Sequence, residues 1–184
     1  LALLVTFMGE DDTFASLREL SEKAAAVTET RALSKKDVNG VFLRWQFTAE
    51  ISNSFERMQS VAVCASFAPV LKKLYPDEAE LEAAKRHLGF FNTNANWGCL
   101  IHGTVLAMEE QRASGADVPE EIITGVKNGL MGPLAGVGDT VDFGTVQVIL
   151  FALGASFATQ GNAFGVVFVI LFGILTFIEA RALF

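Results

Sequence analysis

Apolar residues form two long runs near the end of the chain, at residues 143–159 and 163–178. Each run is close to about 17 residues, the shortest helix that spans the hydrocarbon core of a bilayer. Gly161 and Asn162 separate the runs, and such a pair is a turn signal. The pattern therefore predicts a transmembrane helical hairpin.

Upstream of these runs, the apolar positions are periodic. Ser34 with Asp37 three residues on is typical of a helix N-terminus. After it, apolar side chains recur at helical spacing at Val38, Val41, Phe42, Trp45 and Ala49. This amphipathic helix is expected to lie in the membrane interface or to pack on a partner helix. Residues 58–71 are apolar but too short to span a bilayer, which predicts a re-entrant or buried helix.

A polar helix is expected to open at Pro76-Asp77. Glu78, Glu82 and Arg86 are spaced to pair along one solvated face of it. The helix should stop at the asparagine-rich stretch 92–94, because asparagine favours local turns.

Another helix is predicted over residues 95–113, with Gly115 as its C-cap. Asp117, as a capping residue, and the early Pro119 predict that helix then restarts. The glycine and proline of residues 131–139 predict a break before the hairpin.

These elements predict an all-α membrane protein, in which short broken and re-entrant helices precede a transmembrane helical hairpin. Residues 1–33 are expected to be a peripheral or flexible N-terminal extension, and residues 34–184 a membrane domain. Leu1 is not a start methionine and no polar tail follows Phe184. We therefore expect a fragment, a processed chain or a misplaced start, with the membrane domain truncated at its C-terminal end.

Composition and charge narrow the classes of function. The chain is 51% hydrophobic and 19% charged, with 16 Phe and 16 Gly, and its net charge of −7 argues against nucleic-acid binding. Cys64 and Cys99 have no metal-ligand spacing and are expected to be buried thiols. Lysine and arginine lie before the hairpin and after it at Arg181, but not at its tip. The positive-inside rule therefore predicts cytoplasmic hairpin ends and an outer tip.

Four stretches resemble one known family in their order and spacing. They are FERMQ at 55–59, RHLGFFNT at 86–93, LAMEEQRASG at 106–115 and GVKNGLMGPLAGVGDT at 125–140, continued by FGTV at 143–146. Together they resemble the IID component of the mannose/fructose/sorbose-type sugar phosphotransferase system, over roughly residues 34 to 172.

The resemblance implies a multi-pass subunit of the bacterial cytoplasmic membrane. It implies that a IIC membrane subunit is its partner, that cytoplasmic IIA and IIB proteins carry phosphate on histidines, and that a mannose-type hexose is phosphorylated as it enters. It implies that IID itself is not catalytic, with neither cofactor nor metal. The chain departs from the family pattern at residues 50–54, at residues 140–142 and at Gln147.

The first candidate site residues are Glu56, Arg57 and Gln59, at the mouth of an apolar segment. Adjacent residues on a helix point about 100° apart, so Glu56 and Arg57 are not expected to pair with each other but with partners on another helix. Charges facing a membrane interior need a partner or a water-filled cavity. These residues predict a sugar or IIC contact, or else a structural ion pair.

Asn92 and Thr93 are a second candidate, because they break a helix between apolar neighbours. Transporters use broken helices to line substrate cavities. Asparagine also supplies both donors and acceptors to sugar hydroxyls. The alternative is a plain interhelical loop.

Gly132, Gly136, Gly138 and Asp139 are the third candidate. The run lacks the Lys and Ser/Thr of a phosphate loop. It predicts a close-packed, non-helical membrane break buried in protein, with Asp139 capping the following span. A functional or partner contact and simple architecture both fit this run.

His87 and His102 have no neighbouring catalytic pattern, so structural roles are expected for both. Two other functions stay open. One is a membrane interaction or receptor subunit without transport. The other is a soluble enzyme that binds a phosphorylated ligand at the glycine run.

Overall fold

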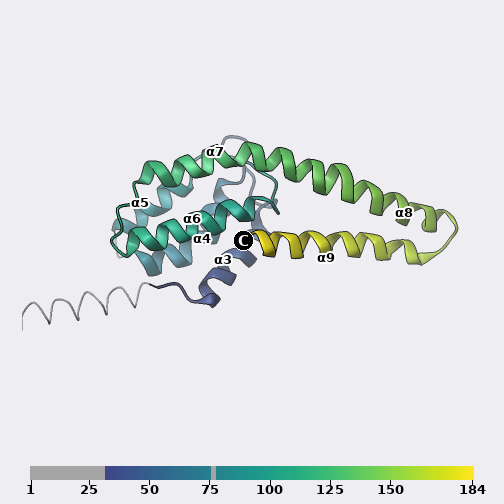
Figure 1. The fold of residues 1–184 in the computed structure, drawn as a ribbon, viewed down its shortest axis with the longest axis horizontal. Helices are drawn as coiled ribbons and strands as arrows, with labels where there is room; N and C mark the ends of the chain where they lie inside the picture. The colour runs from purple at the N-terminus through teal and green to yellow at the C-terminus, as the bar shows by residue number, and fades with distance from the viewer. Residues whose placement is uncertain (1–31, 76–77) are drawn as a thin grey trace, which may run out of the picture. The chain divides into compact units, whose positions relative to one another are not determined.

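The structure is a computed structural model that describes residues 32–75 and 78–184. Residues 33–184 form one compact unit, and the description below concerns that unit. The extension predicted over residues 1–33 lies almost wholly outside the described residues, as does the helix start predicted at Pro76-Asp77. Figure 1 shows helices α3 to α7 grouped together, with α8 and α9 forming a long hairpin beside them.

Helix α3 (Lys35–Thr48) begins where the sequence predicts. The Ser34 hydroxyl accepts a hydrogen bond from the Asp37 backbone N–H at 3.2 Å, and the Asp37 carboxylate accepts one from the Ser34 N–H at 2.9 Å. This reciprocal capping box satisfies two of the N–H groups that a helix start leaves free. The helix buries Val41, Phe42 and Trp45.

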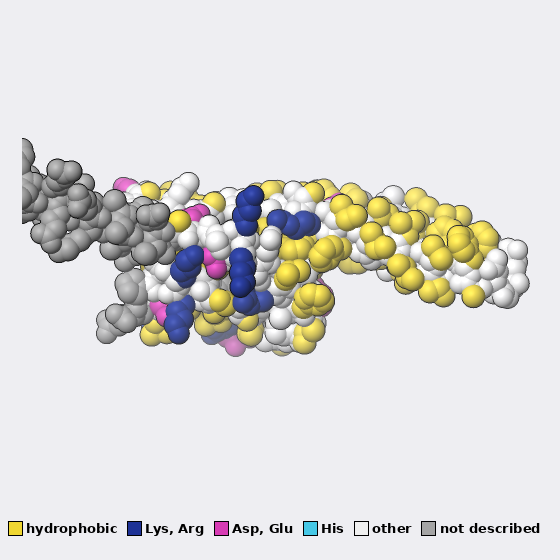
Figure 2. Space-filling view, turned by 90° about the horizontal axis from the view of Figure 1, so that it is seen from below, with side chains coloured by type: hydrophobic (Ala, Val, Ile, Leu, Met, Phe, Trp, Pro, Cys, Tyr) yellow, Lys and Arg dark blue, Asp and Glu magenta, His cyan; other side chains and the backbone are white. Residues whose placement is uncertain are grey.

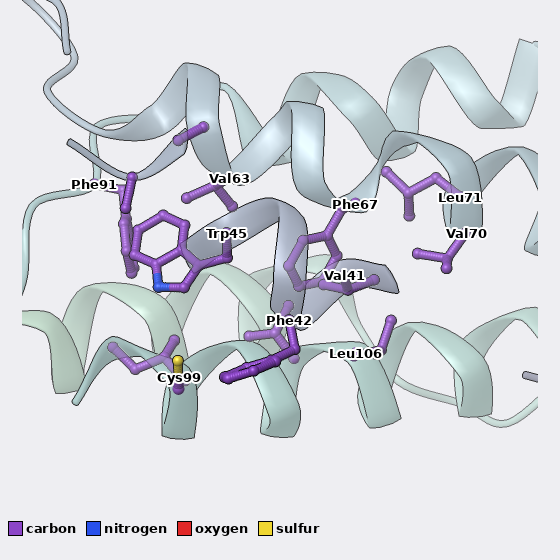
Figure 3. Close-up of a cluster of buried hydrophobic side chains, with 14 of the residues drawn as sticks. Val41, Phe42, Trp45, Val63, Phe67, Val70, Leu71, Phe91, Cys99 and Leu106 are labelled. Atoms are coloured by element: carbon purple, nitrogen blue, oxygen red, sulfur yellow. The ribbon is translucent and has the colours of Figure 1, made fainter. Parts of the chain in front are cut away.

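The core lies between α3, α4 (Ser60–Leu74) and α6 (Gly98–Ala113), with α5 (Glu78–His87) packed on α4. Figure 3 shows its apolar side chains, among them Trp45, Phe67 and Phe91. All three are fully buried, and each such side chain stabilises the fold by about 1.5–3 kcal/mol. Of the two alternatives predicted for residues 58–71, a re-entrant or a buried helix, the structure has the buried helix, α4.

The predicted end of α6 is also confirmed, because Gly115 has a φ of +93° just after the helix. The next helix, α7 (Glu120–Gly138), starts after Pro119 and has no side-chain cap, so the expected capping by Asp117 is wrong. Its first turn carries Glu120 and Glu121, whose charges favour a helix N-terminus.

The break predicted at residues 131–139 is wrong. Helix α7 continues through a π-helical segment, η1 (Asp139–Val146), into α8 (Gln147–Thr159) as one long rod (Figure 1). Asp139 has helical backbone angles inside this rod, so it caps no span. A helix satisfies its own backbone groups, and hydrocarbon offers them no other partner, so membrane helices tolerate glycine and proline that would break a helix in water.

The predicted hairpin is confirmed, with a longer first arm than expected. Two stretches are long and apolar enough to span a membrane, Glu120–Thr159 and Ala163–Leu183. Between them Gly161 has a φ of +70°, and Asn162 caps the short helix η2 (Ala163–Gly165) that leads into α9 (Val166–Leu183).

The arms of the hairpin pack closely at one point. A Cβ added at Gly154 would lie 2.8 Å from the Gly165 carbonyl oxygen, so the two backbones meet where neither residue has a side chain. The remaining surface of α8 and α9 is apolar and exposed, as at Ile149 and Ile170, and Figure 2 shows hydrophobic side chains over the hairpin. In each arm, only 11% of the most apolar 18-residue stretch is buried within the protein, as expected for a surface that contacts lipid.

Candidate functional site

A polar cleft lies where the loop before α6 meets η1 and α9. Its volume is about 560 Å³. The lining side chains are mostly amides, carboxylates and two phenyl rings, from Gln46, Glu50, Gln59, Asn92, Thr93, Asn94, Ala95, Asn96, Ala135, Asp139, Phe143, Phe172 and Thr176.

Gln59 ties the two loops at the cleft together. Its side-chain oxygen accepts from the Thr93 N–H at 3.0 Å, and its amide nitrogen donates to the Thr93 carbonyl at 3.0 Å and to the Glu50 carboxylate at 2.9 Å. Its own N–H donates to the Phe91 carbonyl at 2.9 Å, just after Met58, whose φ is +49°. Gln59 is 3% exposed. It therefore holds the loop and orients Glu50, while its own amide is already bonded.

Asn94 joins that loop to the long rod. Its side-chain oxygen accepts from the N–H groups of Asn96 and Trp97, at 2.9 and 3.1 Å, which closes the turn just before α6. Its amide nitrogen donates to Asp139 at 3.1 Å. Asp139 thus reaches the cleft, but its role is to receive a loop side chain and not to cap a helix.

The three candidate glycines differ in their surroundings. A Cβ at Gly138 would lie 2.6 Å from the Asn94 side chain and 2.7 Å from Trp97. A Cβ at Gly132 or Gly136 would meet nothing within 4 Å. Close packing of another segment against the glycine run is therefore found only at Gly138. The predicted close packing is wrong for Gly132 and Gly136.

Asp142 is a buried carboxylate that the sequence reasoning missed, and it lines a separate hollow beside Thr176 and Glu179. It is 1% exposed and accepts hydrogen bonds from the Asn96 amide at 2.9 Å and the Trp97 indole at 3.3 Å. The sequence feature that could have identified Asp142 is its position three residues after Asp139, as a second carboxylate within an apolar stretch downstream of an asparagine run.

Asn92 is the cleft residue with an uncommitted side chain. It is exposed, and within the described part of the chain its amide has no hydrogen-bond partner. Glu50 lies on the same cleft with an exposed side chain, and the rings of Phe143 and Phe172 line it as well. Amide and carboxylate groups bind hydroxyls, and apolar rings cover the C–H faces of a small polar molecule.

Glu56 and Arg57 lie away from the cleft. Both are exposed in a turn before α4, and they contact each other, with the Arg57 Nε 3.9 Å from the Glu56 Oε1. The expectation that each pairs with another helix is therefore wrong, because neither residue is on a helix. Arg57 instead lines a shallow hollow beside Lys85 and Phe90.

A buried ionic network fixes the start of the loop that carries Asn92. The Glu109 carboxylate on α6 accepts from Arg86 Nε at 2.7 Å and Nη2 at 2.9 Å, from His87 Nε2 at 2.9 Å and from the Tyr75 hydroxyl at 2.6 Å. On α7, Lys127 donates to the Arg86 carbonyl at 3.1 Å. The network thus joins α5 to both α6 and α7.

The sequence spacing predicts that Arg86 lies on a solvated face of the helix. The structure shows that this prediction is wrong. Arg86 is buried, whereas the neighbouring Lys85 forms the exposed pair with Glu82 at 2.7 Å. Burial of Glu109 opposes its ionisation, but hydrogen bonds from His87 and Arg86 outweigh this and lower its pKa to about 2.

Both histidines are buried, and burial lowers the pKa of each, so both are neutral. A neutral His87 donates from Nε2 to Glu109, and its Nδ1 lies 3.5 Å from the Lys127 ammonium. His102 packs against Trp45, with ring centroids 4.1 Å apart, and its Nε2 has no partner within the described residues.

Residues 32–184 match the family model of the mannose/fructose/sorbose family IID component of the phosphotransferase system (PTS). The chain belongs to this family. It is similar to the mannose-specific EIID component of Escherichia coli strain K12, with 46% identity over 151 residues, which cover 80% of this chain and 53% of that protein. It is also similar to the fructose permease IID component of Bacillus subtilis strain 168, with 43% identity over 136 residues, which cover 74% and 49%.

A solved relative has the same fold. In the cryo-EM structure of the mannose transporter ManYZ with microcin E492, one chain matches with a TM-score of 0.79 and 44% identity, over 83% of this chain and 56% of that one. This chain thus spans about half the length of the relatives that it matches.

The four stretches that resemble the IID family meet in this structure. Gln59 ends the first stretch, and Thr93, its hydrogen-bond partner, ends the second. Arg86 opens the second stretch and binds Glu109 of the third. Lys127 in the fourth binds the Arg86 carbonyl. Much of the family pattern in this chain therefore builds the frame around the cleft.

Proposed function

We propose that this IID-family chain works with a IIC membrane subunit to pass a mannose-type hexose across the bacterial cytoplasmic membrane, in which it is a multi-pass protein. Cytoplasmic IIA and IIB proteins supply the phosphoryl group, and the chain itself is not catalytic. The names of the relatives support the sugar class and the partner type. The buried state of both histidines agrees with a role that carries no phosphate.

The cleft with the free amide of Asn92 is the observation that best supports sugar contact. The cleft borders a membrane hairpin, hydrogen bonds of Gln59 and Asn94 hold its loop, and the Asn92 amide has no partner among the described residues. A preorganised frame with a few free polar groups is what a small polar ligand requires. We assign Asn92 and Glu50 to the sugar, and Gln59, Thr93, Gly138 and Asp139 to holding the loop. Glu56 and Arg57 are left for a partner contact.

The glycine run does not support a soluble phosphate-binding enzyme. Its backbone is helical, so its N–H groups are used in the helix and cannot cradle a phosphate. A receptor subunit without transport would share this fold, and uptake measurements separate the two.

The test is the substitution Asn92→Ala. Loss of one hydrogen bond, with a sugar hydroxyl left unpaired, costs about 1–3 kcal/mol, so the apparent affinity for the hexose should fall roughly five- to a hundredfold. Sugar binding is measured on the complex purified with IIC, and co-purification of IIC reports on assembly. Asn128→Ala, an exposed asparagine on α7 outside the cleft, is the matched control. Unchanged affinity in an intact complex would remove Asn92 from the sugar site.

A further inference from the structure

A groove of about 530 Å³ lies between α3 and α4, separate from the polar cleft. It is lined by Lys36, Asp37, Asn39, Gly40, Leu43, Arg44, Pro69 and Val70. Figure 2 shows lysine and arginine side chains gathered on the face that borders the apolar surface of the hairpin. Nothing in the proposed sugar pathway uses this groove.

The charge in the groove is positive. The Asp37 carboxylate is already bound by the Lys73 ammonium at 2.7 Å and by Ser34. Within residues 32–75 and 78–184, Lys36 and Arg44 have no acidic group within 4 Å. Among the described residues, these two cations therefore have no counter-charge.

Gly40 brings one of these cations into the groove. A Cβ at this position would lie 2.9 Å from Arg44 Nη1. The guanidinium thus folds back along α3, over the glycine and toward the helix start that carries Lys36. A side chain at residue 40 would displace it.

The rest of the groove is apolar. Leu43 on α3 lies opposite Pro69 and Val70 on α4, and Leu43 is 44% exposed. Further along α3, Phe47 is 70% exposed. A helix with basic and apolar exposed groups side by side is typical of the membrane interface.

We propose that this groove binds the headgroup of an anionic phospholipid, with its phosphodiester between Lys36 and Arg44 and an acyl chain along Leu43 and Val70. A free phosphate would leave the apolar part of the groove uncovered. An acidic protein surface would supply negative charge but no hydrocarbon chain for this apolar part. The site requires that the chain lies in a membrane, but it does not depend on the sugar or on the cleft.

The test is native mass spectrometry of the full chain, purified in detergent with any partner that it retains. Dioleoylphosphatidylglycerol and dioleoylphosphatidylcholine are titrated separately. Each basic residue near an anionic surface contributes about fivefold in affinity, so the double variant Lys36→Gln/Arg44→Gln should lose roughly 30-fold in phosphatidylglycerol binding. Its phosphatidylcholine binding should not change.

Two other variants make the test specific. Lys35→Gln/Lys72→Gln removes two exposed charges that do not line the groove and should keep the preference for the anionic lipid. Gly40→Leu keeps both charges but displaces the Arg44 guanidinium, so it should lose part of the preference. Circular dichroism checks that each variant keeps its helical content. If the double glutamine variant does not fold, Lys36→Arg/Arg44→Lys is used as well. It keeps both positive charges and should therefore keep the preference for phosphatidylglycerol.

Several results would overturn the proposal. Equal affinity for the two lipids would show that the groove does not recognise an anionic headgroup. An equal loss in the Lys35/Lys72 control would show a diffuse charge effect and no site. Displacement of the lipid by millimolar inorganic phosphate would assign the groove to a free anion, and displacement by a IIB protein would assign it to a protein surface.

Discussion

Glu109 is a carboxylate that the fold keeps ionised although its side chain is fully buried. Four hydrogen bonds from three side chains replace the water that it loses. Sequence spacing pointed to Glu82 as the partner of Arg86, because helical pairing rules consider only residues three or four apart. The true partner lies 23 residues away on another helix, and only the tertiary fold, in which α5 and α6 both contact α4, brings the two together.

The depressed pKa of Glu109 predicts a specific pH dependence of stability. The carboxyl titrates near 2 in the folded chain, against an ordinary value of 4.5. Its contribution is therefore complete above about pH 4.5 and is lost as the pH falls toward 2. Glu109→Gln should lower the free energy of unfolding at pH 7 by about 3 kcal/mol, and this difference should shrink in acid.

Denaturant unfolding in detergent micelles between pH 7 and pH 3 measures this difference. The exposed Glu121→Gln is the control and should follow the unsubstituted chain at every pH. A Glu109→Gln effect that stays constant over this range would contradict the ionic account of the network.

At the scale of elements, local chemistry predicted where several helices begin and end. Ser34, Gly115 and Gly161 mark a helix start, a helix end and the hairpin tip, since each acts through its own backbone or its nearest neighbours. The helix through Pro133 was not predictable in the same way. Turn signals describe chains in water, whereas this segment lies in a span where a continuous helix is the better solution for the backbone.

The surroundings of the glycines predict opposite outcomes for two similar substitutions. Gly138→Leu places carbon atoms against Asn94 and Trp97, and such overpacking costs roughly 1–3 kcal/mol. Gly136→Leu, half a turn earlier, meets open space. The unfolding temperature of the purified chain should therefore fall for Gly138→Leu and change little for Gly136→Leu. Equal effects would mean that the Asn94 contact with the rod is loose.

At the scale of the whole molecule, a membrane fold was readable from hydropathy, but the cleft was not. Its contacts join residues 45 positions apart, as between Asn94 and Asp139. Periodicity gives no such distances. It therefore selected Asn92 and Thr93 as polar residues at a break, but it could not separate the free Asn92 from the bonded Thr93.

The exposed apolar hairpin predicts firm membrane attachment. The chain should stay in the membrane pellet after alkaline carbonate extraction. A charge in the middle of a span costs about 2.5–3.5 kcal/mol, so Ile170→Lys/Ile174→Lys should reduce the pelleted fraction. Leu81 is about as exposed as Ile170 but lies on a helix outside the spans, so Leu81→Lys should leave the pelleted fraction unchanged. Recovery of the unsubstituted chain in the supernatant would contradict the membrane assignment.

The unbroken rod from Glu120 to Thr159 has a mechanical consequence. At 1.5 Å per residue its 40 residues measure about 60 Å, twice the thickness of the hydrocarbon core. Asp139, bonded to the cleft loop through Asn94, lies at its midpoint, where π-helical turns begin. The half of the rod that follows Asp139 is therefore connected to the cleft loop through this hydrogen bond. A tilt of the hairpin, set by bilayer thickness or by a neighbouring subunit, would reach the loop that presents Asn92.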